Sequence, residues 1–260
     1  MPTFHAADGA ELSYTDMGPR GTIPLLFLHG WVADSGTWSA VMGRLAERHR
    51  TLAVDLRGFG ASNAAPGPYR VETFSDDLSA FVAELDLDPL IAIGHSMGAA
   101  VAQRFAIDRP DAIEGLVLVT PVPASGVAFS PRVTAMLRGI AGNAASANAW
   151  LATLTHREPP PEVVALMRKA AAAVPVSVVL ESLASWTTLD FEDEAATIET
   201  PTLVLAPEHD RPMTPTFARA KVANVIPGSR FTVVPDASHY LPLERPDIVA
   251  EAIDRFIMDL

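Results

Sequence analysis

The sequence predicts an α/β protein in which a mostly parallel β-sheet carries helices on both faces. Short apolar runs alternate with helical patterns from Leu25 to Val119, as they do in proteins that cover a parallel sheet on both sides. The same alternation resumes at Thr202. Residues 121–199 show helical patterns and no clear β-run, so we expect them to form a helical insertion in a core made of residues 1–120 and 200–260.

The expected strands are short and rich in aliphatic side chains. Asp8 and Gly9 form a turn dipeptide between two short runs, which predicts a β-hairpin at the start of the chain. The later strands are continuously apolar, as expected where both faces of a sheet are covered. In chain order they lie at 24–28, 51–54, 90–93, 115–119, 202–205 and 231–234.

The expected helices follow from apolar residues at helical spacing and from Pro and Gly at the boundaries. In the core they lie at 37–48, 71–85, 99–108, 215–225 and 246–258. In the insertion they lie at 132–140, 146–154, 161–173 and 176–186.

Composition excludes several classes of function. The formal net charge of −12 argues against nucleic acid or an anionic membrane surface as a partner. The chain has no cysteine, which excludes disulfides, thiolate catalysis and thiolate metal sites. No histidine pair has the spacing of a helical zinc motif, so no metal is expected. The first residues do not resemble a signal peptide, and we expect a cytoplasmic protein.

Residues 94–98 read Gly-x-Ser-x-Gly between an expected strand and an expected helix. This is the context of a nucleophile elbow, in which a sharp turn presents the hydroxyl of Ser96. A side chain at Gly94 or Gly98 would collide with the neighbouring strand or helix. The N-terminus of the following helix offers free N–H groups to an oxyanion.

A serine needs a base and a group that orients the base, and both should follow later strands of the sheet. His239 follows the strand at 231–234 and is the candidate base. Asp210 follows the strand at 202–205 and is the candidate acid, with Glu208 and Asp236 as rivals. The order Ser, acid, His along the chain is that of the nucleophile-elbow enzymes.

The expected oxyanion hole consists of the backbone N–H groups of Met97 and Trp31. The side chain of Trp31 either walls the substrate pocket or packs under the insertion. Trp150, Trp186 and Phe129 give the insertion an apolar inner face that packs as a core and lends part of its surface to the pocket. His29 and His95 are expected to shape the turns beside the site.

Several short motifs occur in the order found in α/β-hydrolases, and the chain resembles that superfamily over nearly its whole length. They are His29-Gly30-Trp31, the glycine-rich turn at 55–62, the elbow at 94–98, Asp210 with Pro215, and Asp236-Ala237-x-His239. The resemblance implies the α/β-hydrolase fold with about eight strands, a cap formed by residues 121–199, and no cofactor. The chain departs from the pattern at Ala206-Pro207, where a glycine is common.

Within the superfamily the chain is similar to small bacterial carboxylesterases, to cofactor-free haloperoxidases (perhydrolases) and to esterases of pimeloyl-carrier methyl ester. We therefore expect a serine hydrolase that acts on a small-molecule ester or lactone through Ser96, His239 and Asp210. The alternatives are a perhydrolase or a C–C bond hydrolase with the same triad, and a ligand-binding protein without catalysis. The apolar face of the cap could also mediate a homodimer.

Overall fold

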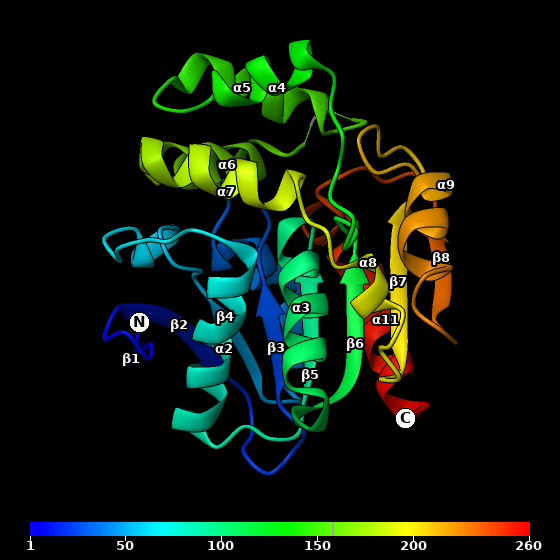
Figure 1. Ribbon diagram of the computed structural model, residues 1–260. Helices are drawn as coiled ribbons and strands as arrows, with labels where there is room; N and C mark the ends of the chain where they lie inside the picture. The colour runs from blue at the N-terminus through cyan, green and yellow to red at the C-terminus, as the bar shows by residue number, and fades with distance from the viewer. Residues whose placement is uncertain (158) are drawn as a thin grey trace.

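The computed structural model describes residues 1–157 and 159–260, which fold around one eight-stranded sheet. The strand order is β1-β2-β4-β3-β5-β6-β7-β8 (Figure 1). The pairs β1–β2 and β2–β4 are antiparallel and the other neighbours are parallel. The strands are β1 (Thr3–His5), β2 (Glu11–Met17), β3 (Leu25–Leu28), β4 (Thr51–Val54), β5 (Leu90–His95), β6 (Ile113–Val119), β7 (Thr202–Pro207) and β8 (Arg230–Val234). The expected hairpin and the mostly parallel sheet are confirmed.

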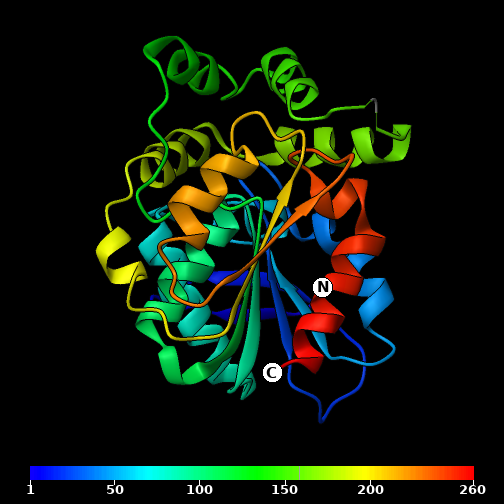
Figure 2. The ribbon, with the colours of Figure 1, turned by 90° about the vertical axis from the view of Figure 1, so that its right-hand side faces the viewer.

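Helices cover both faces of the sheet, with α1 and α11 on one face and α2 and α3 on the other (Figure 2). The expected α/β class is thereby confirmed. The helices are α1 (Ser39–Leu45), α2 (Val71–Leu85), α3 (Met97–Asp108), α4 (Pro131–Arg138), α5 (Ala144–Thr153), α6 (Pro161–Ala173), α7 (Val176–Thr187), α8 (Glu192–Ala195), α9 (Pro215–Ala218), α10 (Leu241–Glu244) and α11 (Pro246–Met258).

The pleat of β3 explains why its sequence is apolar at every position. Leu26 and Leu28 enter the buried cluster on the side of α2 and α3. Leu25 and Phe27 enter the cluster on the side of α1 and α11. Successive side chains of a strand point to opposite faces, so a strand covered on both sides has no polar face.

Two of the expected helices are wrong in their form. The helix expected at 37–48 begins as a 3₁₀ turn at Ser35–Trp38, which is capped by the Asp34 carboxylate through a 2.9 Å hydrogen bond from the N–H of Gly36. The α-helical part ends at Leu45. The helix expected at 215–225 is a four-residue α9 followed by a π-helical segment, Arg219–Ala223, in which the N–H of Asn224 bonds the carbonyl of Arg219.

Helices α4, α5, α6 and α7 lie above the carboxyl ends of the parallel strands, with α4 and α5 stacked over α6 and α7, and we call these four helices the helical layer (Figure 1). Helix α8, which the sequence did not reveal, lies beside α3 instead, where Glu194 pairs with Arg104 at 2.9 Å. Within the described residues no single helix is long and apolar enough to cross a membrane. Helices α6 and α7 reach the required length and apolar composition only when they are taken together, and the two helices meet at a bend of 99°.

Candidate active site

Ser96 occupies the turn between β5 and α3 with φ 54° and ψ −117°, a region that residues other than glycine rarely adopt. A Cβ atom at Gly94 would press on the carbonyl of Gly98 and lie 2.6 Å from the Cα of Ala99. A Cβ atom at Gly98 would lie 2.5 Å from the carbonyl oxygen of His29. Both glycines therefore permit the close approach of helix and strands that holds Ser96 in its strained turn, as the sequence predicted.

Replacing Gly94 with alanine is expected to destabilise the fold by about 1–3 kcal/mol, because the atoms in the way are backbone atoms that cannot turn aside. The matched control is Gly43→Ala in α1, where nothing lies within 4 Å of the new Cβ. The free energy of unfolding of the control should rise by about 0.5–1 kcal/mol, because alanine has a better helix propensity than glycine. Urea unfolding followed by circular dichroism measures both, and equal free energies of unfolding for the two variants would contradict the steric argument.

The structure brings Ser96, His239 and Asp210 into one hydrogen-bonded chain. Nε2 of His239 lies 3.1 Å from Oγ of Ser96, and Nδ1 lies 2.9 Å from Oδ2 of Asp210. The three residues expose 8%, 7% and 3% of their surface, so water competes little for these bonds. Oδ1 of Asp210 accepts the N–H of Met213 at 3.1 Å, which fixes the carboxylate toward the imidazole.

The two rival acids lie elsewhere. Oε2 of Glu208 accepts the backbone N–H of Asp236 at 3.1 Å. Oδ1 of Asp236 pairs with the guanidinium of Arg157 at 2.7 Å. The structure therefore places Asp210, and neither rival, against Nδ1 of His239.

Two buried side chains hold the backbone of His239. Its carbonyl accepts a hydrogen bond from Nε2 of His95 at 2.8 Å and one from the hydroxyl of Thr120 at 3.3 Å. Burial lowers the pKa of His95 to about 3, so this ring is neutral and carries its proton on Nε2. The sequence predicts a supporting role for His95 but not for Thr120, whose only signal in the sequence is its place directly after β6.

His29 joins the turns that follow β3 and β4. Its Nδ1 donates to the carbonyl of Gly30 at 2.8 Å, and its Nε2 accepts the N–H of Leu56 at 3.0 Å. Burial lowers the pKa of His29 and keeps it neutral, which this pairing requires. The carboxylate of Asp55 adds a second link, because it accepts the N–H of Ser35 at 2.7 Å. These bonds fix the loop on which Trp31 lies.

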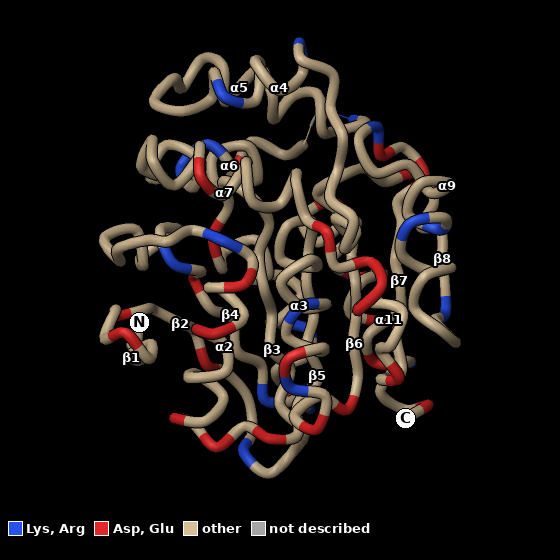
Figure 3. Tube along the Cα trace, viewed as in Figure 1, with Lys and Arg blue, Asp and Glu red and all other residues tan. Residues whose placement is uncertain are grey.

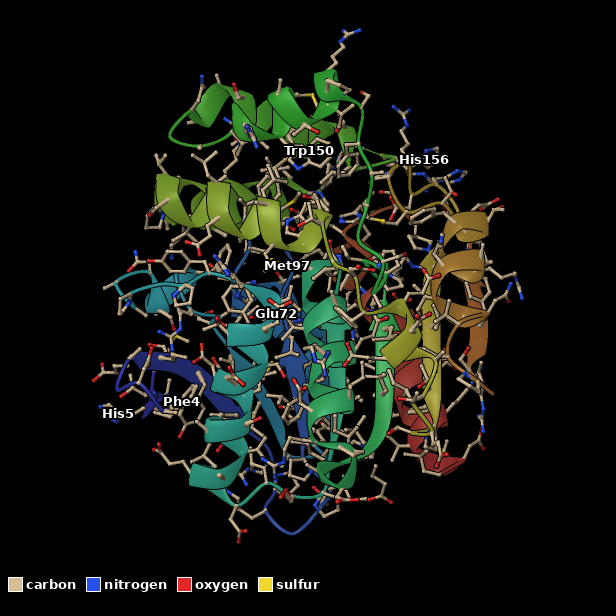
Figure 4. All side chains as sticks on the ribbon, in the orientation of Figure 1. Phe4, His5, Glu72, Met97, Trp150 and His156 are labelled. Carbon is tan, nitrogen blue, oxygen red and sulfur yellow. The ribbon has the colours of Figure 1, made fainter. Side chains whose placement is uncertain are left out.

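The N–H groups of Trp31 and Met97 have no hydrogen-bond acceptor among the described residues. Met97 is the first residue of α3, where helix geometry leaves an N–H without an intrahelical partner (Figure 4). Trp31 lies in the loop after β3 and follows Gly30, where an added Cβ atom would lie only 3.1 Å from the Cβ atom of Ser96. This loop therefore passes close to Ser96. Both groups are therefore available to a ligand beside Ser96.

Ser96 and His239 face a cavity of about 30 Å³, which has room for little more than water. All four residues expected in the pocket line it: Trp31, Trp150, Trp186 and Phe129. The rings of Trp31 and Phe129 each pack against Trp186 at 5.8 Å between centroids. The remaining lining residues, which the sequence did not indicate as pocket residues, are Gly30, His95, Leu154, Pro212, Met213 and Tyr240.

A larger cavity of about 380 Å³ lies between α5 and α6, lined in part by Leu151, Met167 and Arg168. Leu151 and Met167 pack against Leu154 and Tyr240, which line the small cavity. A single apolar layer thus separates the larger cavity from Ser96.

Comparisons with known proteins concern the family and the fold of the chain. The sequence model of the alpha/beta hydrolase family matches residues 25–252. A 2-(acetamidomethylene)succinate hydrolase of Mesorhizobium japonicum is 28% identical over 250 residues, which are 92% of this chain and 89% of that protein. A non-heme chloroperoxidase of Streptomyces lividans is 34% identical over 125 residues, so the match spans 47% of this chain and 45% of that protein.

Two solved structures match nearly the whole chain. A thermophilic esterase from Thermogutta terrifontis superposes with a TM-score of 0.85 and 28% identity over 100% of this chain and 99% of that one. An enol-lactonase from Burkholderia xenovorans superposes with a TM-score of 0.88 and 28% identity, and the match covers 99% of this chain and 100% of that one. The family model, these structures and the strand order confirm the resemblance found in the sequence: the chain belongs to the alpha/beta hydrolase family.

Proposed function

We propose that this hydrolase cleaves carboxylic esters or lactones, with Ser96 as nucleophile, His239 as base and Asp210 as the orienting acid. The observation that carries the proposal is the hydrogen-bonded chain from Oγ of Ser96 through both ring nitrogens of His239 to Asp210. A hydroxyl is a poor nucleophile until a base takes its proton, and this geometry supplies the base at 3.1 Å.

The reaction has two halves that share one base. Nε2 of His239 takes the proton of Ser96 as Oγ attacks the carbonyl carbon, and Asp210 stabilises the resulting imidazolium. The alcohol leaves with that proton, and an acyl group stays on Ser96. His239 then takes a proton from water, the hydroxide attacks the acyl group, and the carboxylic acid leaves as Ser96 regains its proton. In a lactone the alcohol and acid remain parts of one hydroxy acid.

The oxyanion of both tetrahedral intermediates needs donors on the side away from His239. The N–H groups of Met97 and Trp31 fill this role in our proposal, since both lack another acceptor among the described residues. Each such donor contributes about 3 kcal/mol to the transition state.

The lining of the small cavity favours an uncharged acyl group. It combines aromatic and aliphatic side chains, and it includes no Lys, Arg, Asp or Glu among the described residues. A charged acyl chain would lose its hydration there without gaining a partner. Because the volume is only about 30 Å³, an acyl group enters only when the aromatic wall moves, and we propose that the helical layer acts as a cap that opens.

Replacing Trp150 with alanine is expected to raise the ratio of kcat/KM for hexanoate over acetate esters by at least about tenfold. The half-buried indole lines the cavity from α5, and its removal makes room for methylenes that are each worth about 0.8 kcal/mol when buried. The control is Leu180→Ala at an exposed position of α7, which should leave the ratio unchanged. An unchanged ratio in Trp150→Ala would place the acyl group elsewhere.

The experiment that tests the function measures turnover of p-nitrophenyl esters from acetate to octanoate and of lactones of increasing ring size. Mass spectrometry after treatment with a fluorophosphonate then locates the adduct. We expect saturable turnover of at least one ester or lactone and one adduct on Ser96. Turnover without an adduct on Ser96 would overturn the assignment of the nucleophile. Neither turnover nor an adduct would favour a ligand-binding protein.

The match to a non-heme chloroperoxidase favours a second candidate reaction on the same acyl-enzyme. Hydrogen peroxide in place of water would attack the acyl group and release a peracid, with the proton passing to His239 as before. Peracid formed from acetate and peroxide would support this reaction, and it is detected because it oxidises added bromide to a species that brominates monochlorodimedone. Hydrolysis that is unaffected by peroxide would exclude it.

A further inference from the structure

Two histidines and an aspartate from three separate segments meet beside the triad. His156 follows α5, His209 follows β7, and Asp236 follows β8. One ligand atom from each lies within 4.8 Å of the others. We propose that these three side chains bind a divalent transition-metal ion, for which Zn²⁺ is the best fit.

The two imidazoles already lie against each other, with ring centroids 3.7 Å apart and planes inclined by 23°. A nitrogen lone pair lies in the plane of its ring, so stacked rings share an ion only after one of them turns. The ring of His156 is exposed, and among the described residues no hydrogen bond restrains it. Its backbone is anchored, because its N–H donates to Oγ of Ser238 at 2.8 Å. The proposal therefore requires a rotation of the His156 side chain, on a backbone that this hydrogen bond holds in place.

The donor set selects the class of ion. Two imidazole nitrogens and one carboxylate oxygen suit Zn²⁺, with water as the fourth ligand of a tetrahedron. Mg²⁺ and Ca²⁺ prefer sites made of oxygen alone, and this cluster does not provide one. The sequence predicts no metal site, because these three residues lie far apart along the chain and form no spacing motif.

The surrounding charges permit a cation. The carboxylate of Glu208 lies 3.7 Å from Nε2 of His209 and adds negative potential. Arg157 contacts Oδ1 of Asp236 at 2.7 Å, but that pair is exposed, with 73% and 44% of the two side chains open to solvent. Exposed ion pairs are weak, so an ion displaces the guanidinium at little cost. Acidic and basic positions lie close together on these loops, at the upper right of Figure 3.

A bound ion would join the helical layer to the two loops that carry the acid and the base. His156 lies at the side of the helical layer nearest the loop after β7 (Figure 4). His209 directly precedes Asp210, and Asp236 lies in the same loop as His239. The ion would therefore restrain the segment between α5 and α6 at the place where it meets the active site.

Isothermal titration of the tag-free chain with ZnCl₂ tests the site without use of turnover. We expect one equivalent of Zn²⁺ to bind, no comparable binding of Mg²⁺, and affinity at least about tenfold lower in His156→Gln and in His209→Gln. The matched control is His5→Gln, an exposed histidine on β1, which should bind as the unsubstituted chain does. Zn²⁺ in about hundredfold excess over Kd should also raise the Tm, and the two site variants should lose this rise.

The proposal would be overturned if Zn²⁺ showed no saturable binding. It would also be overturned if His156→Gln and His209→Gln both bound Zn²⁺ as tightly as the unsubstituted chain. A loss of Zn²⁺ affinity in His5→Gln as large as the loss in the site variants would overturn it as well. Thermal unfolding without metal checks that the variants are folded. We expect His156→Gln to fold normally because His156 is exposed. Since neither readout involves ester cleavage, a negative result leaves the proposed hydrolysis untouched, and a failed esterase assay leaves the metal site untouched.

Discussion

Replacing Ser96 with alanine is expected to lower kcat for ester cleavage by about 10⁶-fold. The variant keeps the cavity, His239 and the N–H groups of Met97 and Trp31, but it has no atom that can form the acyl-enzyme. What remains is catalysis by substrate positioning and by the oxyanion donors, which exceeds the reaction in water by about 10³–10⁴-fold. Initial rates with the ester that the unsubstituted chain cleaves best measure the loss.

The control for this variant is Ser79→Ala in α2, whose hydroxyl donates to the carbonyl of Ser75 and which does not line the cavity beside Ser96. It should keep the full rate. A Ser96→Ala protein that retains more than about 1% of the rate would require another nucleophile. If activity were lost together with a large fall in Tm, the loss would be due to unfolding. The Tm of both serine variants is therefore measured beside the rates.

The sheet and the elbow were predictable because their signals are local. β3 is apolar at every position because it is buried on both faces, and this pattern can be recognised in the sequence of the strand alone. Gly94 and Gly98 mark the strained turn because no other residue fits between the backbones that crowd them. The order of the chain then restricts where a base and an acid can lie, and the two candidates chosen on that ground, Asp210 and His239, are in hydrogen-bond contact in the structure.

The contacts that the sequence did not reveal are made by residues distant along the chain. Thr120 holds the carbonyl of His239, yet a lone threonine after a strand has no distinctive pattern. His156 and His209 stack only because the segment after α5 folds down onto the loop after β7. Helix α8 is too short for periodicity to show. In each case the information lies in tertiary packing, which pattern and propensity do not encode.

Replacing Asp210 with asparagine is expected to lower kcat by about 10⁴-fold while the fold remains intact. The carboxylate accepts the proton of Nδ1 of His239 at 2.9 Å, which leaves Nε2 free to accept the proton of Ser96. An amide can offer an N–H to Nδ1 instead, and the ring would then carry its proton on Nε2, facing Ser96 as a donor. The imidazolium of the transition state would also lose the negative charge that stabilises it. Steady-state rates at pH 7 measure the loss.

Glu208→Gln is the matched control, since it removes a carboxylate two residues away and keeps an oxygen for the N–H of Asp236. It should lower kcat by less than about tenfold, because an exposed charge near the site acts weakly. The reverse order, with the larger loss in Glu208→Gln, would mean that the acid loop moves when substrate binds and that Glu208 replaces Asp210 at the imidazole. The comparison therefore tests whether the closed arrangement, with its cavity of about 30 Å³, is also the one in which the chemistry takes place.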